Sequence, residues 1–327
     1  MIQPTLVSKG YHMDIYNYTM TTGITRSPKF EQKRLAMYAV NPGIKCGHGC
    51  TYCSTGAMLR THRAFKLIGR SPYDNTYAIV DPDTPNRVAC DAKRIQERGM
   101  IQLSTIVDAW APEAQEYDIG RRCLTVILDE SDWSIRILTK NAAVRQDFDI
   151  IQKYADRVLV GVSITATPAK AHLVGVTEPH ASSIQERIAV LHEAHARGFR
   201  TYAMFCPLLP GIADKADDID ELVCLARDIG AEEIFVEPVN TRGRGLIMTQ
   251  EALQKAGHVI EASAIGEIRK QKNWSVYVRR LVERVQRSVR HYYNNTERLR
   301  FLLYPGALLP EDLAAIQKDD GGVVWLT

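Results

Sequence analysis

Short apolar runs rich in β-branched residues alternate with amphipathic segments through the first three quarters of this chain. The runs predicted as strands cover residues 35–40, 100–107, 134–139, 157–165, 199–206 and 233–239. The predicted helices between them cover residues 114–129, 142–155, 183–197 and 215–229. In the third helix, the apolar side chains recur at helical spacing and Gly198 follows its end. This alternation predicts βαβ units with a parallel sheet, and six strands favour a partial, TIM-like (β/α)6 barrel.

The predicted barrel core spans residues 35–240, and different patterns flank it. Residues 1–34 form an N-terminal extension whose fold the pattern does not define. Residues 241–327 are mainly helical, with predicted helices at 250–272, 274–293 and after Pro310. A short strand is predicted at residues 300–304, before the last helix, and residues 323–326 form a final apolar stretch. Residues 66–98 are poorly patterned and contain three prolines, which predicts an insertion or a lid.

Composition places the chain among ordinary soluble globular proteins. Of its 327 residues, 45% are hydrophobic and 24% charged. We expect no signal peptide, because residues 1–10 lack a basic start followed by an apolar core. No apolar run approaches the length of about 20 residues that a membrane span needs. Four of the seven cysteines are scattered, which argues against a disulfide framework and predicts a reducing, cytoplasmic location: Cys90, Cys123, Cys206 and Cys224.

Three further cysteines stand within eight residues, in the order Cys46-Gly-His-Gly-Cys50-Thr-Tyr-Cys53. Three thiolates on one loop can each hold one iron of a cubane cluster, whereas a ferredoxin-type cluster takes four cysteines. No fourth cysteine lies nearby, so one iron would keep an open position for a ligand. The alternatives are a zinc knuckle and a chance group of cysteines. For zinc, His48 is the available fourth ligand, but its place inside the Cys46–Cys50 loop makes a tetrahedron sterically poor.

At these residues the sequence resembles the radical SAM superfamily. The resemblance implies a [4Fe-4S] cluster whose open iron binds S-adenosyl-L-methionine (SAM), with reductive cleavage to a 5′-deoxyadenosyl radical. Further pieces resemble the spore photoproduct lyase-like (DNA repair photolyase-like) branch, over roughly residues 36–240. In chain order they lie at residues 41–42, 108–113, 139–140, 178–179 and 207–211. An oxygen-labile cluster also suits a reducing compartment.

The resemblance assigns cofactor contacts to polar residues near the predicted strand ends, where αβ barrels gather their reactive groups. Tyr52 would pack near the adenine, Lys140 would reach the methionyl carboxylate or ribose, and Ser163 would hydrogen-bond the cofactor. Ser104, Glu237 and Asn240 are further candidates for cofactor binding. A solvated loop lysine and a small buried serine are the plain alternatives for Lys140 and Ser163.

Other polar residues near the strand ends have two interpretations each. Asp108 and Glu113 either take part in the site or cap the following helix, whose N-terminus favours acids. Arg242 and Arg244, in the sequence Thr-Arg-Gly-Arg-Gly, either bind a phosphate or carboxylate or occupy a solvated turn.

Two departures from the family bear on the reaction. No Gly-Gly-Glu follows the second predicted strand, where superfamily members often hold the methionyl amine. The lyase itself uses a cysteine in this neighbourhood as hydrogen donor, but residues 102–105 read Gln-Leu-Ser-Thr. Cys206, late on the fifth predicted strand, is the remaining candidate for a catalytic hydrogen donor, although buried cysteines are usually inert.

Charge is concentrated near the C-terminal end. Residues 269–300 contain ten Lys or Arg and two acids, within a chain of net charge +3. In the predicted helix 274–293, an apolar stripe lies opposite a basic ridge that includes Arg280, Arg284 and Arg287. Arginines beside aromatic residues suit a DNA or RNA partner. A solvated helix paired with acids elsewhere is the competing interpretation.

Taken together, the sequence predicts a radical SAM enzyme that acts on a nucleic acid or a nucleotide-like substrate. Reductive cleavage would require an electron donor of the flavodoxin or ferredoxin type. One alternative keeps this chemistry but directs it to a peptide or small metabolite. Another is a non-catalytic nucleic-acid-binding protein with a structural metal site.

Overall fold

The computed structural model describes residues 4–9, 13–130 and 132–327, and its strands form three sheets. The largest sheet has six strands in the order β10-β9-β8-β7-β4-β3, and all but the edge strand β3 pair in parallel. The bounds are β3 Thr25–Arg26, β4 Tyr38–Val40, β7 Met100–Leu103, β8 Ser134–Thr139, β9 Val158–Val162 and β10 Arg200–Thr201. The predicted strand at residues 134–139 is therefore observed with the same limits.

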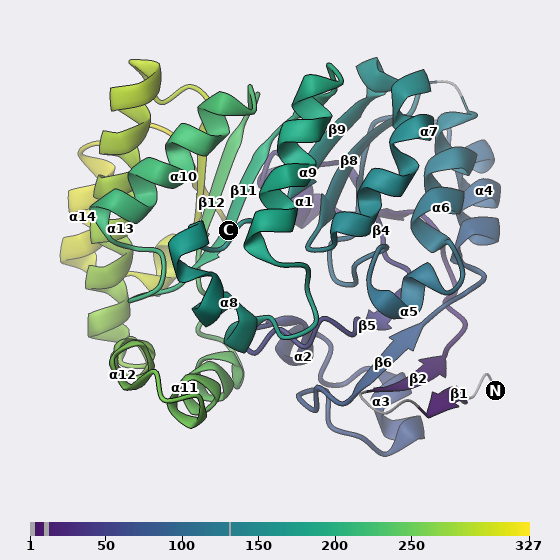
Figure 1. Ribbon diagram of the computed structural model, residues 1–327, viewed down its shortest axis with the longest axis horizontal. Coiled ribbons are helices and arrows are strands. Elements are labelled where there is room, and N and C mark those ends of the chain that lie inside the picture. Colours follow the sequence, from purple (N-terminus) through teal and green to yellow (C-terminus); the bar gives the residue numbers. More distant parts are fainter. Residues whose placement is uncertain (1–3, 10–12, 131) are drawn as a thin grey trace.

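A second sheet continues the parallel arrangement. Its order is β11-β12-β13-β14, with bounds Ala203–Leu208, Ile234–Pro238, Leu299–Leu303 and Val323–Trp325. A parallel bridge between Ser163 and Met204 joins β9 to β11, so the two sheets follow each other across the molecule (Figure 1). The parallel α/β architecture is confirmed. No pairing joins β14 to β3 in the part of the chain that the structure describes, and the partial (β/α)6 barrel stays a prediction.

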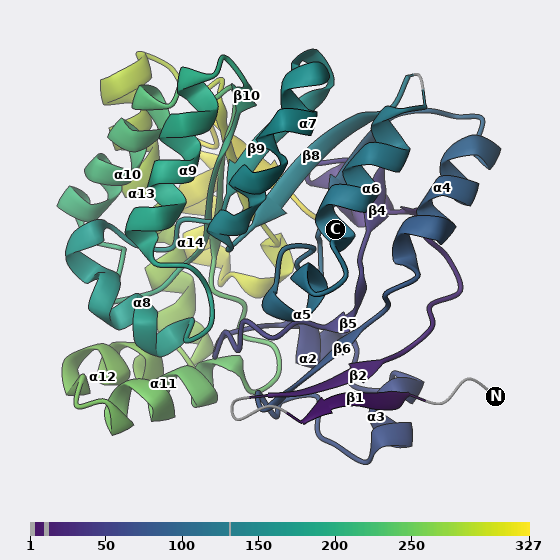
Figure 2. The same cartoon turned by 45° about the vertical axis from the view of Figure 1, so that its right-hand side comes forward.

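Helices cover the outside of these strands (Figures 1 and 2). They are α4 Thr84–Arg94, α6 Ile119–Leu128, α7 Phe148–Lys153, α9 Ile184–Ala196, α10 Ala216–Asp228, α13 Gln271–Tyr293 and α14 Pro310–Gln317. The predicted helix at 114–129 is divided into α5, Pro112–Gln115, and α6, because Asp118 between them has a left-handed backbone with φ of 50°. Helix α9 begins with a capping box between Ser183 and Glu186.

The third sheet is small and lies below the main strands (Figure 1). Its order is β1-β2-β6-β5, with bounds Thr5–Lys9, Asp14–Asn17, Tyr77–Val80 and Gly43–Lys45. Residues 66–98 are regularly folded despite their poor pattern, since this segment provides β6 and α4. Their interpretation as an insertion or a lid stays a prediction. Pro85 is compatible with α4 because it lies in the first turn, where the missing N–H has no helical partner. Within the predicted N-terminal extension, residues 1–3 and 10–12 lie outside the described part, and α1 covers Pro28–Gln32.

Both faces of the parallel strands are buried. The main core cluster fills the space between strands and outer helices, and includes Val158, Val160 and Val162 of β9. A second cluster lies on the other face, and includes Leu159 of the same strand with Tyr202, Met204 and Phe235. This explains the continuous apolar run at residues 158–162, because a strand covered on both faces has no polar alternation.

The C-terminal region adds both helices and the last two strands. The predicted helix at 250–272 is two helices, α11 Gly245–Lys255 and α12 Val259–Glu267, separated at Gly257 with φ of 85°. Helix α13 is confirmed, and it buries the apolar stripe of Val278, Leu281, Val282, Val285 and Val289. Among the described residues, no helix has the length and apolar character needed to cross a membrane. The division of the chain at residues 34 and 240 stays a prediction.

Candidate functional site

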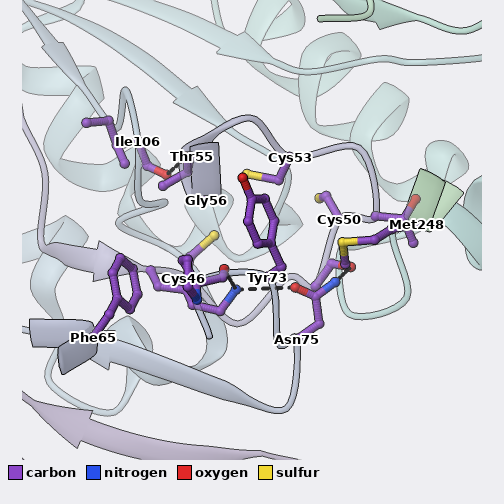
Figure 3. A pocket seen from close by; sticks show the side chains of 14 residues that line it. Cys46, Cys50, Cys53, Thr55, Gly56, Phe65, Tyr73, Asn75, Ile106 and Met248 are labelled. Atoms are coloured by element: carbon purple, nitrogen blue, oxygen red, sulfur yellow. Dashed lines mark hydrogen bonds between the residues drawn. The ribbon is translucent and has the colours of Figure 1, made fainter. Parts of the chain in front are cut away.

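The three cysteines of the Cys46–Cys53 loop line one pocket. The loop connects β5 to α2, Thr55–Met58. Figure 3 shows Cys46, Cys50 and Cys53 around this pocket with Tyr73, Asn75, Phe65 and Met248. None of the three thiols is in a disulfide; Cys53 is exposed, and the other two are half-buried. The structure therefore brings together the three residues that the sequence predicted as metal ligands.

Hydrogen bonds from distant segments fix the backbone of this loop. The amide of Gly47 donates to Glu113 at 2.9 Å, and the amide of Thr51 donates to the carbonyl of Thr177 at 2.9 Å. The Asn75 side-chain amide donates to the carbonyl of Gly49 at 3.0 Å. These supports leave little freedom for the loop, so the positions of its thiols are determined by the surrounding fold.

His48 is directed away from the role of a metal ligand. It is 2% exposed, and its Nε2 lies 2.9 Å from an Asp108 carboxylate oxygen while Nδ1 lies 3.2 Å from the carbonyl of His180. Asp108 also accepts hydrogen bonds from the Thr139 hydroxyl at 2.9 Å and from the backbone of Lys140 at 2.8 Å. Since both ring nitrogens of His48 are engaged, the zinc interpretation loses its fourth ligand. Asp108 thus links the cysteine loop to the ends of β7 and β8.

The environment of the thiols disfavours their charged forms unless a cation is bound. Burial raises the pKa of Cys50 to about 12, and the nearby Glu178 carboxylate adds to the effect. Burial, together with Glu113, also raises the pKa of Cys46. Metal binding would displace these protons, because only thiolates are ligands. No group of three His, Cys, Asp or Glu side chains among the described residues surrounds the position of a single metal ion.

A buried polar network adjoins the loop and is centred on Glu178. Its carboxylate, 2% exposed, accepts hydrogen bonds from the Tyr52 hydroxyl and from Thr165, the latter at 2.7 Å. It also forms an ion pair with Arg187 and lies 3.4 Å from the ammonium of Lys140. Burial opposes the charge, but Arg187 and Lys140 outweigh it and lower the pKa of Glu178 to about 2.

Lys140 and Ser163, both predicted as cofactor contacts, meet in this network. The Lys140 ammonium donates to the Ser163 hydroxyl at 2.7 Å and lies 5.6 Å from the centre of the Tyr52 ring. The Ser163 hydroxyl donates to the carbonyl of Cys206 at 2.8 Å. Tyr52, Lys140 and Ser163 thus come together from the cysteine loop and the ends of two parallel strands.

Sequence reasoning missed the central members of the network. Glu178 appeared only as part of a family motif, and Arg187 was hidden within a predicted helix. One signal was available for Arg187, which is fully buried. It stands three residues after Ile184 and four before Leu191, on the apolar stripe of α9. A charged residue on such a stripe requires a buried partner.

Cys206 and Glu237 form a second group, which extends toward the N-terminal segment. The Cys206 thiol donates to a Glu237 oxygen at 3.3 Å, and the Lys33 ammonium donates to the same carboxylate at 3.0 Å. Burial, with the Glu237 charge, raises the pKa of Cys206. The thiol therefore stays protonated and holds a hydrogen atom rather than a nucleophilic charge.

Ser104 and Asn240 take part in local turns. Ser104 has φ of 75°, and its hydroxyl accepts a hydrogen bond from the amide of Ala109 at 2.8 Å. The Asn240 side chain accepts one from the amide of Arg242 at 2.8 Å. In the described residues, neither side chain hydrogen-bonds to the cysteine loop or to Lys140. Their predicted contacts with a cofactor stay predictions.

The segment after Asn240 packs closely onto the cysteine loop. A Cβ at Gly245 would lie 2.8 Å from the carbonyl oxygen of Tyr52, and one at Gly243 would lie 2.7 Å from Ala57. Only glycine permits this approach, and Gly243 also has φ of 77°. The neighbouring Arg242 and Arg244 are exposed. Helix α11 continues the contact, since the hydroxyls of Thr249 and Thr51 lie 2.9 Å apart.

The basic ridge of α13 is only partly free. Arg284 forms an ion pair with Asp214, in which the charged atoms are 3.7 Å apart. A ligand that binds Arg284 would have to break this ion pair. Arg280 and Arg287 are exposed. Helix α13 lies at the left of the molecule in Figures 1 and 2, whereas α2 and the small sheet beneath the cysteine loop lie toward the centre and right. The ridge is thus a separate surface from the cysteine pocket.

Comparison with known proteins gives uncharacterized relatives and one enzyme fold. No protein-family model matches the chain. An uncharacterized protein of Methanocaldococcus jannaschii is 26% identical over 179 residues, which cover 55% of this chain and 63% of that protein. An uncharacterized protein of Mycobacterium tuberculosis is 25% identical over 214 residues, 64% of this chain and 62% of that protein. The chain thus matches less than two thirds of the length of these relatives.

The fold is similar to that of spore photoproduct lyase. A tyrosine-to-phenylalanine mutant of that enzyme superposes with a TM-score of 0.57 over 85% of this chain and 79% of the other, at 14% identity. A cysteine-to-alanine mutant with dinucleoside spore photoproduct gives a TM-score of 0.51 over 74% of this chain and 66% of the other, at 15% identity. These likenesses concern the fold.

Proposed function

We propose that this chain is a radical SAM enzyme of the spore photoproduct lyase-like branch, built on a partial barrel, that removes a hydrogen atom from a nucleic-acid or nucleotide-like substrate. One observation carries the proposal. Three free thiols from one short loop line a single pocket, and this loop also carries Tyr52 into the network of Lys140, Ser163 and Glu178.

The residues present suit a [4Fe-4S] cluster and SAM. Cys46, Cys50 and Cys53 would hold three irons and leave the fourth for SAM, to which the reduced cluster supplies one electron. Asp108 and Glu113 hold the loop through His48 and Gly47, and so act as positioning residues.

The polar network supplies a cationic donor beside the loop. Lys140 carries three N–H donors, of which one is engaged by Ser163, and Glu178 offsets its charge. A group with a carboxylate or hydroxyls, such as the methionyl or ribose part of SAM, suits this donor. Ser163 and Tyr52 orient Lys140, and the burial of Glu178 and Arg187 excludes water from the inner side.

The substrate class rests on a fold neighbour and on charge, and the proposed reaction differs from that of the lyase. A fold neighbour contains dinucleoside spore photoproduct, and residues 269–300 here are strongly basic. However, no cysteine stands near Ser104, where the lyase has its hydrogen donor. We therefore propose hydrogen abstraction but not the lyase reaction, with Cys206 as the candidate donor because its thiol is protonated and partly buried.

Anaerobic reconstitution tests the proposal. The wild-type chain should bind about four irons and, with a reductant, convert SAM to 5′-deoxyadenosine. Alanine at Cys46, Cys50 or Cys53 should abolish both properties. Alanine at Cys90 or Cys224 is the matched control and should change neither. A chain that binds no cluster, or loses it equally in the controls, would show that the proposal is wrong.

Deuterium transfer identifies the substrate class. Deuterated oligonucleotides, peptides and nucleosides would be incubated with the reconstituted enzyme and SAM. Deuterium should enter 5′-deoxyadenosine from the oligonucleotide or nucleoside. Transfer from a peptide alone would instead support a radical SAM enzyme that modifies peptides. Transfer from none of them, with nucleic-acid binding intact, would support a non-catalytic protein with a structural metal site.

A further inference from the structure

The outer surface next to the cysteine pocket is basic and unpaired. Residues 32–73 contain no Asp or Glu. Within this stretch, Arg60, Arg63 and Lys66 are exposed, and their side chains form no ion pair with any residue that the structure describes. Met58 and Leu67, 57% and 38% exposed, lie among them in the sequence. We call these five residues, on α2, on α3 (Arg63–Ile68) and between them, the α3 surface.

One short helix separates this surface from the pocket. On its inner side α3 buries Ala64 and Phe65, and Phe65 lines the same pocket as the three cysteines. On its outer side Arg63, Lys66 and Leu67 face solvent. Helix α3 lies at the lower right in Figures 1 and 2, on the side opposite α13. An electron that enters at this surface has to pass only α3 to reach the cysteine pocket. Cys53 itself is exposed.

The neighbouring charges show that the surface is not simply part of a network of surface ion pairs. Arg70, just after α3, is neutralised by Asp14 at 2.6 Å and Asp74 at 2.7 Å. Among the described residues, Arg60, Arg63 and Lys66 have no such acidic partner. Free positive charge beside a site raises the rate of encounter with a partner of opposite charge.

The character of the surface favours a protein over a nucleic acid. Its exposed apolar side chains are aliphatic. Protein surfaces that bind single-stranded nucleic acid instead combine Lys and Arg with aromatic side chains that stack on the nucleobases. A small patch of apolar side chains with a charged rim is typical of a transient protein interface. The α3 surface therefore fits an acidic protein that binds briefly.

We propose that the α3 surface is the docking site of an acidic one-electron carrier protein, which reduces the cluster through the wall formed by α3. The proposal rests on the proposed function, since it requires a cluster in the cysteine pocket. In the transfer, the carrier loses one electron and the cluster gains one, and no bond or proton is exchanged. The carrier is then replaced by another reduced copy, which a weak, charge-steered interface permits.

Charge reversal tests the docking site. The variant R60E/R63E/K66E would be compared with K93E/K153E/K318E, which makes the same change of charge at exposed lysines on α4, on α7 and just after α14. Reduced flavodoxin is the probe; its affinity is measured by titration calorimetry at low and high salt, and its rate of cluster reduction by stopped-flow absorbance. We expect affinity and rate to fall by at least about tenfold in the α3 variant at low salt. The control should stay close to wild type.

A chemical reductant separates this proposal from the proposed function. With dithionite, which needs no docking surface, the α3 variant should cleave SAM at the wild-type rate. If wild-type protein fails to cleave SAM with dithionite, the proposed function is wrong. The calorimetric affinity for flavodoxin still tests the α3 surface in that case. The docking proposal is wrong if carrier binding and reduction are unchanged in the α3 variant, or fall equally in the control. It is also wrong if the variant loses only single-stranded DNA binding.

Discussion

At the scale of single residues, the buried Glu178 is the side chain on which most of the candidate site depends. It neutralises Arg187, lies close to Lys140 and accepts a hydrogen bond from Tyr52. Replacing it by glutamine keeps the shape but leaves Arg187 without a counter-charge in the interior. We expect Glu178→Gln to lower the free energy of unfolding by about 3 kcal/mol at pH 7. Urea denaturation measures this, and Glu186→Gln is an exposed control expected to lose about 1 kcal/mol or less.

The same carboxylate gives a pH dependence with a definite sign. Its pKa in the folded chain is about 2, below the ordinary value of 4.5. The unfolded chain therefore takes up this proton first as the pH falls, so the stabilisation is complete above pH about 4.5 and disappears toward pH 2. The difference in stability between wild type and Glu178→Gln should shrink over that range. A difference that is constant from pH 6 to pH 3 would contradict the assignment.

The sequence predicts the role of a site residue best when the residues that act with it lie close to it in the chain. Cys46, Cys50 and Cys53 were predictable because a cluster motif lies within one loop. Tyr52, Lys140 and Ser163 were predicted through a resemblance, and the structure places them together. Glu178 and Arg187 were not assigned roles, because an ion pair between a loop and a helix leaves no regular spacing in the chain. Asn240 and Ser104 were named by position at strand ends, but their polar groups already serve local turns.

At the scale of elements, the start of α11 is pressed against the cysteine loop. A Cβ at Gly245 meets the backbone of Tyr52, which cannot move aside as a flexible side chain could. We expect Gly245→Val to destabilise the fold by about 2 kcal/mol and to reduce the iron bound on reconstitution. Gly175→Ala is the control, because the exposed Gly175 in α8, Ala171–Thr177, has open space around it. It should gain about 0.5–1 kcal/mol with unchanged iron content.

Helix α9 provides a second test, because its first turns carry Arg187. The Ser183 hydroxyl accepts a hydrogen bond from the amide of Glu186 at 3.2 Å, and the Glu186 carboxylate accepts one from the amide of Ser183 at 2.8 Å. Ser183→Ala should lower the stability by about 1 kcal/mol, and Ser183→Asp should restore most of the loss. Thermal unfolding of the two variants measures the effect. If Asp fails to restore stability, the cap is not what holds the start of α9.

Elements with a regular pattern were predictable, and interruptions were not. The strand at 134–139 and the helices α9 and α10 follow from periodicity. The break between α5 and α6 depends on the left-handed backbone of Asp118, which periodicity does not indicate. Strand β6 was missed because its partners, β2 and β5, are far apart in sequence.

At the scale of the whole molecule, the cysteine pocket, the α3 surface and the α13 ridge are separate regions. If nucleic acid binds the ridge, the exposed Arg280 and Arg287 are the residues free to contact phosphates, since Arg284 is held by Asp214. The variant R280A/R287A should weaken binding to single-stranded DNA and reduce the slope of log affinity against log salt by about 1.4. Fluorescence anisotropy at several salt concentrations measures both. An unchanged slope would exclude the two arginines from the contact.

Parallel architecture was predictable for the whole molecule, but its extent was not. The strand–helix repetition indicated six parallel strands, and the short strand predicted at residues 300–304 is observed as β13. The structure shows that β13 and then β14 continue the sheet beside β12. Residues 239–298, mostly helix and loop, separate β13 from β12, and β14 lies further along the chain, so no local pattern joins these two strands to the sheet.

The supports of the cysteine loop have a consequence for how the protein is made. During synthesis, Thr51 cannot form its contact with Thr249 until the chain has grown by 198 further residues. At about 5–20 residues per second, a ribosome needs roughly 10–40 s to add the missing partner. During that time the thiols emerge on a loop that cannot yet adopt its final form. Under the proposed function, insertion of the cluster would therefore come late in the life of each new chain, and the free thiols would be exposed to oxidation until then.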